Sequence, residues 1–488
     1  MSAQEASLKT VSGDSKVSKQ DKQQGAVSHH ELKQTLGTWH LWSIAVGLVI
    51  SGEYFGWSLG WAQAGTLGFL LTTIFIAAMF LAFIFSFTEL TTSIPHAGGP
   101  FAYAHHAFGE TGGYLAGAAT LIQYVFTPPT IALAIGGYLS FQFKGLDPKT
   151  AALGAYAVFM LLNIVGIQIA AAFELVVTAF AIFELLVFMG VVSPGFAFSN
   201  FVAHGWSGQE HFSSLAIPGM FAAIPFAVWF FGCIDGVAMA AEEAKSPRRS
   251  IPRAYIGAIV TLVVLAFGVM IFAGGTGDWR QIANKDAPLP EAMRIVVGEH
   301  SGWLHMMVWL GLGGLVASFH GIILGYSRQI FAQARAGYLP RFLANVNPMF
   351  KTPHWAILTG GVVGIATIYV VSWVAKGGAD EVMFDIAVIS VLGMMAMYGI
   401  SMLALFKLRI SEPNLARPFR APGYPFVPAF ALFGIAVSLA SMIWFYPVLA
   451  GLFVGVVAVG YVVFRMTRRA RDEAPSDSMI VPATSMND

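Results

Sequence analysis

One acidic side chain stands in the middle of the first long apolar stretch of this sequence. Residues 50–57 read ISGEYFGW in one-letter code, and Glu53 directly follows Ser51 and Gly52. A carboxylate at membrane depth costs at least roughly 2.5–3.5 kcal/mol, so it usually faces a cavity, a partner or an ion. Glycine lets the chain leave helical geometry, and freed backbone groups can then line a polar site. The pattern indicates a site for a small cation inside a membrane.

The composition excludes a soluble protein. Hydrophobic residues make up 56% of the 488 and charged residues only 11%, whereas soluble domains carry about 25% charged residues. The single cysteine, Cys233, rules out an intrachain disulfide. No phosphate loop and no metal-binding pattern occurs, so we expect no cofactor and no bound metal. The basic runs at 245–253 and 465–471 are explained by membrane topology, and we expect no nucleic-acid partner.

Apolar runs of about 20 residues predict an all-α integral membrane protein with about twelve spanning helices in the lipid bilayer. The expected spans are 39–63, 66–90, 113–141, 150–168, 172–194, 218–241, 253–274, 303–327, 355–374, 383–406, 426–445 and 447–465. The polar segment 1–37 is expected to be a disordered cytoplasmic tail, and 467–488 a second cytoplasmic tail.

The basic residues predict the orientation of these spans. With the N-terminus inside, 21 of the 27 Lys and Arg residues fall on the cytoplasmic side and six on the outer side. Because cytoplasmic loops carry an excess of Lys and Arg, both termini are expected to be cytoplasmic, in a bacterial inner membrane.

A second interruption resembles the first. Residues 231–236 read FGCIDG, so the sixth span also combines glycine with an acid, Asp235, in mid-hydrophobic sequence. The two interruptions lie five spans apart, and an odd number of spans inverts the second half relative to the first. Interrupted helices at matching places in two halves predict the binding site of a transporter. The alternative is that these glycines only allow close helix packing.

Three motifs resemble the amino acid–polyamine–organocation superfamily of secondary carriers. Residues 89–103 (ELTTSIPHAGGPFAY) match that family's E-L-x-x-x-x-P-x-A-G-G-x-x-x-Y pattern, and 242–253 (EEAKSPRRSIPR) match its E-E-x-K-x-P run after the sixth span. Ser327 and Arg328, followed by 334–340 (ARAGYLP), resemble a third family pattern. The resemblance implies a five-plus-five inverted repeat with discontinuous first and sixth helices, at 38–194 and 195–410, and two extra helices within 411–466.

The first interruption departs from the superfamily's usual I-G-S-G-I-F, because Glu53 replaces the second glycine. In amino acid carriers of this family the substrate carboxylate docks on the freed amides here, and a fixed carboxylate would repel it. The segment from Ser51 to Gly65 resembles the bacterial ethanolamine permeases of the superfamily. That resemblance implies import of ethanolamine by alternating access, coupled to a cation, with a proton favoured over sodium.

The expected site residues cluster at the two interruptions and on the spans facing them. By resemblance, Trp229 matches an aromatic gate six residues before the acid. The expected substrate-binding residues are Ser51, Gly52, Glu53, Tyr54, Trp57, Gln123, Trp229, Phe230, Phe231 and Gly232. The expected coupling or gating residues are Asp235, Glu184, Glu242, Glu243, His320 and Ser318. For each of them, a structural role such as packing or hydrogen bonding is the alternative.

Several details leave alternatives open. Cys233 replaces a glycine that the family places two residues before the acid. Some proton-coupled members of the family carry a lysine in the fifth span, and the matching position here is about Ala181. Glu174 and Glu184 flank that position. If the coupling ion is sodium rather than a proton, Ser318 could be one of its ligands. The rival functions are an amino acid or polyamine permease or exchanger, and, more distantly, an amine sensor that transports nothing. No nucleophile–base or metal set indicates an enzyme.

Overall fold

A computed structural model describes residues 35–165, 170–375 and 378–468. This part of the chain is helical apart from two isolated β-bridges. The longer helices are α2 (Thr38–Val49), α3 (Gly52–Ser93), α4 (Pro100–Gln142), α5 (Pro148–Val165), α6 (Ala170–Val192), α10 (Pro247–Gly274), α12 (Gly302–Arg335), α13 (His354–Ala375), α14 (Ala379–Ser411), α15 (Phe426–Phe445) and α16 (Pro447–Met466). Shorter elements are α7 (Phe198–Val202), α8 (Ile217–Ala222), α9 (Ile224–Trp229), α11 (Pro288–Val297) and the 3-10 helices η1 (Ser193–Gly195), η2 (Ser214–Ala216), η3 (Ile234–Glu243), η4 (Trp279–Gln281) and η5 (Arg341–Ala344).

These helices make twelve membrane crossings. Eleven helical stretches of the described residues are long and apolar enough to span a bilayer, and the first of them, Thr38–Ser93, has 56 residues. At 1.5 Å per residue it would be about 84 Å long, against a hydrocarbon core of about 30 Å. Inside it Gly65 adopts φ 70°, ψ 177°, which reverses the chain. The stretch is therefore two spans, and the total is twelve.

The expected all-α fold is confirmed, and the expected spans match the helices to within five residues, with three exceptions. The helix of the seventh span begins at Pro247 rather than at 253. The helix of the third span begins at Pro100 rather than at 113, with a left-handed residue at Gly109. The eighth span continues as α12 to Arg335 rather than ending at 327. In each case the extra turns are polar, and a hydropathy pattern does not record polar helical turns.

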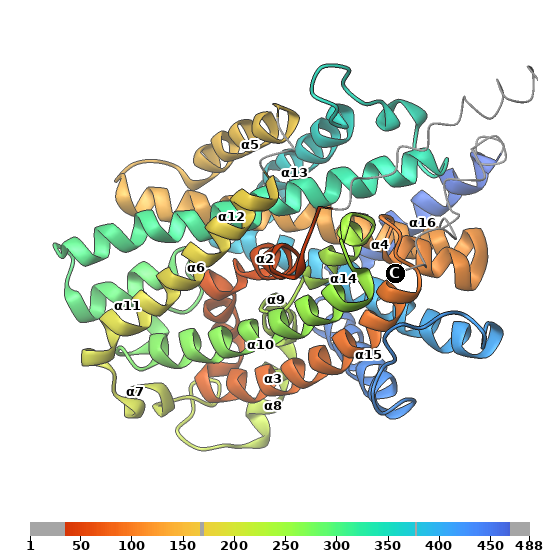
Figure 1. Cartoon of the computed structure of the whole chain (residues 1–488). Helices are drawn as coiled ribbons and strands as arrows, with labels where there is room; N and C mark the ends of the chain where they lie inside the picture. The colour runs from red at the N-terminus through yellow and green to blue at the C-terminus, as the bar shows by residue number, and fades with distance from the viewer. Residues whose placement is uncertain (1–34, 166–169, 376–377, 469–488) are drawn as a thin grey trace, which may run out of the picture.

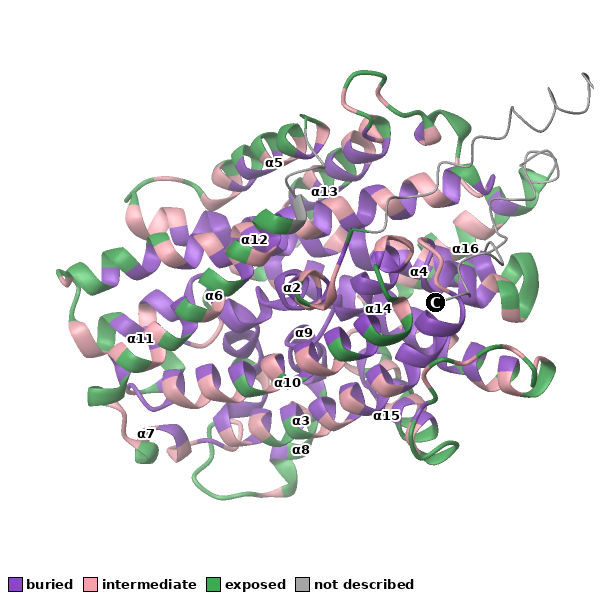
Figure 2. Ribbon diagram, viewed as in Figure 1, coloured by how far each residue is buried: buried purple, intermediate pink, exposed green. Residues whose placement is uncertain are grey.

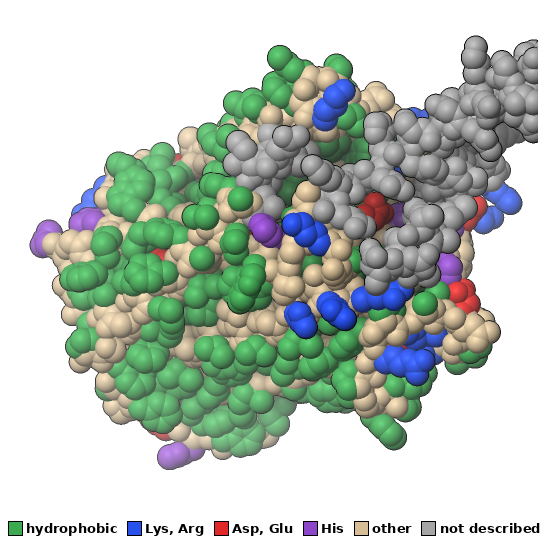
Figure 3. All heavy atoms as spheres, in the orientation of Figure 1, with side chains coloured by type: hydrophobic (Ala, Val, Ile, Leu, Met, Phe, Trp, Pro, Cys, Tyr) green, Lys and Arg blue, Asp and Glu red, His purple; other side chains and the backbone are tan. Residues whose placement is uncertain are grey.

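The bundle is built around the interrupted first and sixth spans. In Figure 1 α2 and α9 lie near the centre, α5 runs beside α13, and α7 and α11 lie at the left end. Figure 2 shows that α9 is buried throughout and α2 is buried in its second half, whereas α5 and the other outer helices are more exposed. Hydrophobic side chains cover much of the surface, while Lys and Arg gather mostly toward the right (Figure 3). We call the end that carries loops 244–246, 336–353 and 412–425 the basic end.

The start of the described chain is docked rather than free. Residues 1–34 of the expected disordered tail lie outside the described residues. Leu36, which we had included in that tail, is 5% exposed. Its amide donates to the carbonyl of Glu243 at 2.9 Å, and its own carbonyl accepts from the amide of Lys245 at 2.9 Å. The chain before the first span therefore contacts the end of the sixth, because an apolar side chain and two backbone bonds hold it there.

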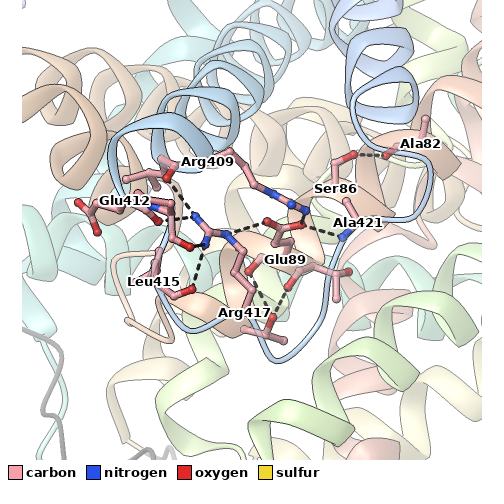
Figure 4. Close-up of polar contacts among 12 residues, drawn as sticks. Ala82, Ser86, Glu89, Arg409, Glu412, Leu415, Arg417 and Ala421 are labelled. Atoms are coloured by element: carbon pink, nitrogen blue, oxygen red, sulfur yellow. Dashed lines mark hydrogen bonds and ion pairs between the residues drawn. The ribbon is translucent and has the colours of Figure 1, made fainter.

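A buried ion cluster ties the second span to the loop after the tenth (Figure 4). Glu89, 1% exposed, lies 2.5 Å from Arg409 Nη2 and 3.2 Å from Arg417 Nε, and it accepts a 2.7 Å bond from the amide of Ala421. Arg417 also donates to four backbone carbonyls of the loop, those of Leu408, Glu412, Pro413 and Leu415. The glutamate of the E-L motif thus organises the basic end.

Candidate functional site

The first interruption is a tight turn between α2 and α3. Ile50 and Ser51 end one helix and begin the next without full helical hydrogen bonding. The amide of Glu53 donates to the carbonyl of Ile50, and the amide of Tyr54 donates to that of Ser51, both at 3.1 Å. Because these bonds close the turn, the two amides are already engaged.

The second interruption is wider and is strained at one residue. The chain leaves α9 after Trp229 and resumes as η3 at Ile234. Between them Cys233 adopts φ 68°, ψ 5°, a left-handed conformation that favours glycine. The family's glycine would sit there without strain, so cysteine keeps the shape at a cost of about 1–2 kcal/mol.

The two interruptions touch each other. A Cβ atom at Gly52 would lie 2.5 Å from the carbonyl oxygen of Trp229, which no side chain tolerates. Gly52 is therefore needed for the close approach of the first and sixth spans. The prediction that these interruptions meet is consistent with this contact.

A small cavity lies where they meet. Its volume is about 10 Å³, which is room for about one water molecule. Three of its lining residues, Ser51, Trp229 and Gly232, are expected substrate-binding residues. The full lining consists of Leu48, Val49, Ser51, Thr127, Trp229, Gly232, Cys233 and Met394. A space of this size is too small for an organic solute.

Glu53 is fully buried beside the first interruption, and it does not line this cavity. Neither of its carboxylate oxygens has a hydrogen-bond partner among the described residues. Only its backbone carbonyl is used by a side chain, accepting a 3.0 Å bond from Trp57 Nε1. A buried charge without a partner is costly, so this carboxyl is either protonated or paired with a cation that the chain does not supply.

Tyr54 points to the fifth span rather than into the cavity. Its hydroxyl donates a hydrogen bond to Glu184, whose other oxygen, Oε1, has no partner within the described chain. Tyr138 of the third span lies beside this pair, with its ring centroid 6.4 Å from that of Tyr54, and its hydroxyl is also unpaired there. A tyrosine of the first span thus connects the site to the acid that we expected to carry a proton.

Asp235 has the opposite character, because all its oxygens are satisfied. Its carboxylate accepts from Gln123 Nε2 at 3.0 Å, Tyr124 at 3.1 Å and Tyr398 at 2.7 Å. The hydroxyl of Tyr255 donates to its carbonyl at 3.4 Å. Asp235 and Gln123 therefore form a network that joins the third, sixth and tenth spans.

The other aromatic candidates pack away from the cavity. Phe230 lies 6.0 Å from Phe69 and Phe231 lies 5.3 Å from Phe80, both on the second span. The ring of Trp57 packs against that of Trp61 in the first span, with the centroids 4.5 Å apart and the planes tilted by 56°. Among the expected aromatic residues, Trp229 alone lines the cavity.

Ser318 connects the eighth span to the first interruption. Its hydroxyl donates to the carbonyl of Leu48 at 2.8 Å and lies 3.0 Å from the hydroxyl of Ser51. Two hydroxyls and a carbonyl therefore converge here. A movement of the first span at its interruption would change the contacts of Ser318.

A larger cavity of about 80 Å³ lies toward the basic end. Glu243 and Arg328 line it and form an ion pair at 3.0 Å. His320, a third lining residue, lies 2.9 Å from the amide nitrogen of Asn163. The other lining residues are Leu36, Ile44, Leu48, Glu174, Gly236, Met239, Gly321, Leu324 and Gly325. Among the expected gating residues, Glu242 lies outside this lining, where it accepts a 2.7 Å bond from the amide of Ala97.

The family model named Amino acid permease matches residues 36–474 of this chain. The chain belongs to that family. This chain is 30% identical to an uncharacterized transporter from Mycobacterium tuberculosis. The alignment extends over 465 residues, which are 92% of this chain and 95% of the relative. This chain is 24% identical to the branched-chain amino acid permease of Bacillus subtilis, over 85% of this chain and 89% of the relative. It is also 24% identical to the methylthioribose transporter of Bacillus subtilis, over 90% of this chain and 94% of the relative.

All three relatives are named as transporters or permeases, and the two from Bacillus subtilis are named for different substrates. With its apolar helices, this chain is a multi-pass membrane transporter. Sequence reasoning missed three apolar residues of the small cavity, Leu48, Val49 and Met394, which carry no polar group that would single them out. Thr127 also lines this cavity, and its hydroxyl lies 2.6 Å from that of Ser390.

Proposed function

We propose that the permease imports ethanolamine across a bacterial cytoplasmic membrane by alternating access, coupled to a cation, with a proton favoured over sodium. The basic end and both termini lie in the cytoplasm, as the distribution of Lys and Arg indicates. Ethanolamine is a small ammonium with one hydroxyl and no carboxylate.

The proposal depends above all on the unpartnered carboxyl of Glu53. It is fully excluded from water, directly after the first interruption, and no cation of the described chain pairs with it. A solute ammonium would provide that partner. Opposite charges at this depth attract strongly once water is excluded.

The backbone of the first interruption also favours a solute without a carboxylate. The amides of Glu53 and Tyr54 donate to carbonyls of the turn, so they are not free to bind an anion. A carboxylate would meet a negatively charged side chain and no free amide from these two residues.

The cavity of about 10 Å³ must open before an amine can enter it. In the proposed cycle the ammonium arrives from the end opposite the basic end, the first span shifts to present Glu53, and Trp229 closes over the solute. An indole face adds about 0.5–2 kcal/mol of cation–π attraction. Rocking of the bundle then opens the route toward the basic end.

The decisive experiment is uptake of labelled ethanolamine into proteoliposomes by Glu53→Gln. The variant keeps the shape and removes the charge, and breaking a buried pair costs about 3–5 kcal/mol. We expect kcat/KM for uptake to fall at least about 100-fold. Glu299→Gln is the matched control, because Glu299 is exposed and pairs only with Lys144 at 3.3 Å. Uptake by Glu53→Gln at the control's rate would refute the assigned role.

An amino acid carrier is the second candidate, and the named relatives favour it. Besides the branched-chain permease, cationic amino acid transporter 1 of Arabidopsis thaliana is 27% identical over 67% of this chain and 56% of the relative. Competition of labelled ethanolamine with alanine, arginine, choline and putrescine separates the two candidates. Stronger competition by an amino acid than by unlabelled ethanolamine would support this second candidate.

A further inference from the structure

A second unpaired carboxylate lines the larger cavity. Glu174 of α6 is 5% exposed, and its Oε1 has no hydrogen-bond partner among the described residues. Gly47 makes room for it, because a Cβ atom there would overlap Oε1. A Cβ atom at Gly321, on the facing helix, would lie 3.6 Å from the same oxygen, in ordinary contact. The helices on both sides thus accommodate an acid that nothing in the described chain neutralises.

The arginine that lines this cavity already forms an ion pair with another residue. Arg328 lines the same cavity, but it pairs with Glu243 at 3.0 Å. His320, which also lines it, accepts a hydrogen bond at Nδ1 from the side-chain amide of Asn163, so the neutral ring carries its proton on Nε2. The acceptor that a cation entering this cavity would find is therefore the free oxygen of Glu174.

The size and the walls of the cavity fit a small organic ammonium. Its volume of about 80 Å³ is eight times the 10 Å³ of the small cavity. Apolar side chains of Ile44, Leu48, Met239 and Leu324 form much of the remaining lining. Methylene groups would pack on these side chains while the charged end faces Glu174, which is a combination that a bare metal ion would not use.

The cavity also lies on the route from the interruptions to the basic end. Leu48 lines both this cavity and the small one, so the two cavities are neighbours. Leu36 and the Glu243–Arg328 pair, which lie next to the loop 244–246 of the basic end, also line the larger cavity. A solute leaving the interruptions toward the basic end would pass Leu48, reach Glu174 and then meet the ion pair.

We propose that the cavity lined by Glu174 is a second binding site for a primary ammonium. The solute would occupy it after leaving the two interruptions and before reaching the basic end. The proposal rests on the proposed function in that the transported solute is an amine. The new element is that Glu174, and not Glu53, binds the ammonium during release toward the basic end.

Sided kinetics in proteoliposomes test this assignment with the full-length transporter. For Glu174→Gln we expect the KM for ethanolamine presented at the basic end to rise about tenfold. The KM at the opposite end should change less than about twofold, because Glu53 governs entry there. Equal changes at both ends, or no change at either, would overturn the proposal. A general folding defect would lower the rates from both sides together.

A second measurement does not require ethanolamine to be the substrate. Dicyclohexylcarbodiimide modifies carboxyl groups in apolar surroundings, and peptide mapping by mass spectrometry reports the modification of Glu174, with Glu174→Gln as the blank. We expect methylammonium and ethanolamine to protect Glu174, and neutral ethylene glycol to give no protection, both in the wild type and in Glu53→Gln.

The outcomes separate the two proposals. Protection by methylammonium but not by ethanolamine supports the ammonium site and contradicts the proposed solute. Absence of protection by either amine overturns the site. Protection that disappears in Glu53→Gln also overturns it, because the effect would then originate at the first interruption.

Discussion

The hydroxyl of Tyr54 in the first span donates a hydrogen bond to the carboxylate of Glu184 in the fifth span and lies 3.4 Å from the carbonyl oxygen of Ala181. Both side chains are fully buried, and the second oxygen of Glu184 has no partner among the described residues. A change in the charge of Glu184 would therefore be transmitted directly to the helix that carries Glu53. This contact supports a coupling role for the pair.

The first prediction concerns this bond. Tyr54→Phe removes the donor and leaves a buried carboxylate without it, at a cost of about 1.5–3 kcal/mol. We expect the stimulation of uptake by an imposed proton gradient to fall about tenfold, with a KM change of less than about threefold. Tyr326→Phe is the control, because Tyr326 donates to the carbonyl of Ile357, away from the two interruptions. An unchanged response to the gradient would exclude the pair from coupling.

The second prediction concerns the gate. Trp229→Ala removes the only aromatic ring that lines the small cavity, and we expect the KM for uptake to rise about tenfold, whereas Trp229→Phe should keep most of the affinity. Phe230→Leu serves as the comparison, because Phe230 packs against Phe69. It should lower thermal stability and leave KM nearly unchanged. Equal KM values for Trp229→Ala and the wild type would argue against a gate.

The third prediction concerns backbone strain at the second interruption. Cys233→Gly places in the left-handed conformation the residue that adopts it without strain, so we expect about 1 kcal/mol of stabilisation. Cys233→Val adds a β-branched side chain to the same conformation and should destabilise by a larger amount. Thermal unfolding of the purified protein in one detergent compares the three. A lower melting temperature for the glycine variant than for the wild type would contradict the strain.

The fourth prediction concerns the ion cluster at the basic end. Glu89→Gln leaves Arg409 and Arg417 buried against a neutral amide, and we expect a loss of about 3–5 kcal/mol of stability. Arg420→Gln alters an exposed arginine of the same loop and should change stability by less than 0.5 kcal/mol. Thermal unfolding of both variants at equal detergent concentration provides the comparison. Similar melting temperatures for the two would mean that the cluster contributes little.

Much of the fold was predictable, because its main determinants are local. Apolar run lengths predicted the spans, and glycine next to an acid predicted the interruptions at Glu53 and Asp235. The glycine replaced by Cys233 was noticed in the sequence, and the backbone explains it: the cysteine keeps the left-handed conformation.

The orientation of side chains around the site was not predictable. Phe230 and Phe231 differ from Trp229 only in the direction they face, which depends on how far each residue is rotated around the interruption. Leu36 docks against the sixth span through tertiary contacts that a polar flanking sequence conceals. Met394 lines the cavity because the tenth span passes there, and an apolar residue in an apolar helix carries no signal of such contact.

The ten residues of η3 form an unusually long 3-10 helix, whereas such runs rarely exceed three or four residues. A 3-10 helix rises about 2.0 Å per residue and an α-helix about 1.5 Å. Rewinding η3 into an α-helix would therefore shorten it by about 5 Å. With its start held at Cys233, that contraction would draw Glu243 inward and part it from Arg328. A change from 3-10 to α-helical geometry within η3 alone would then break the ion pair at the basic end.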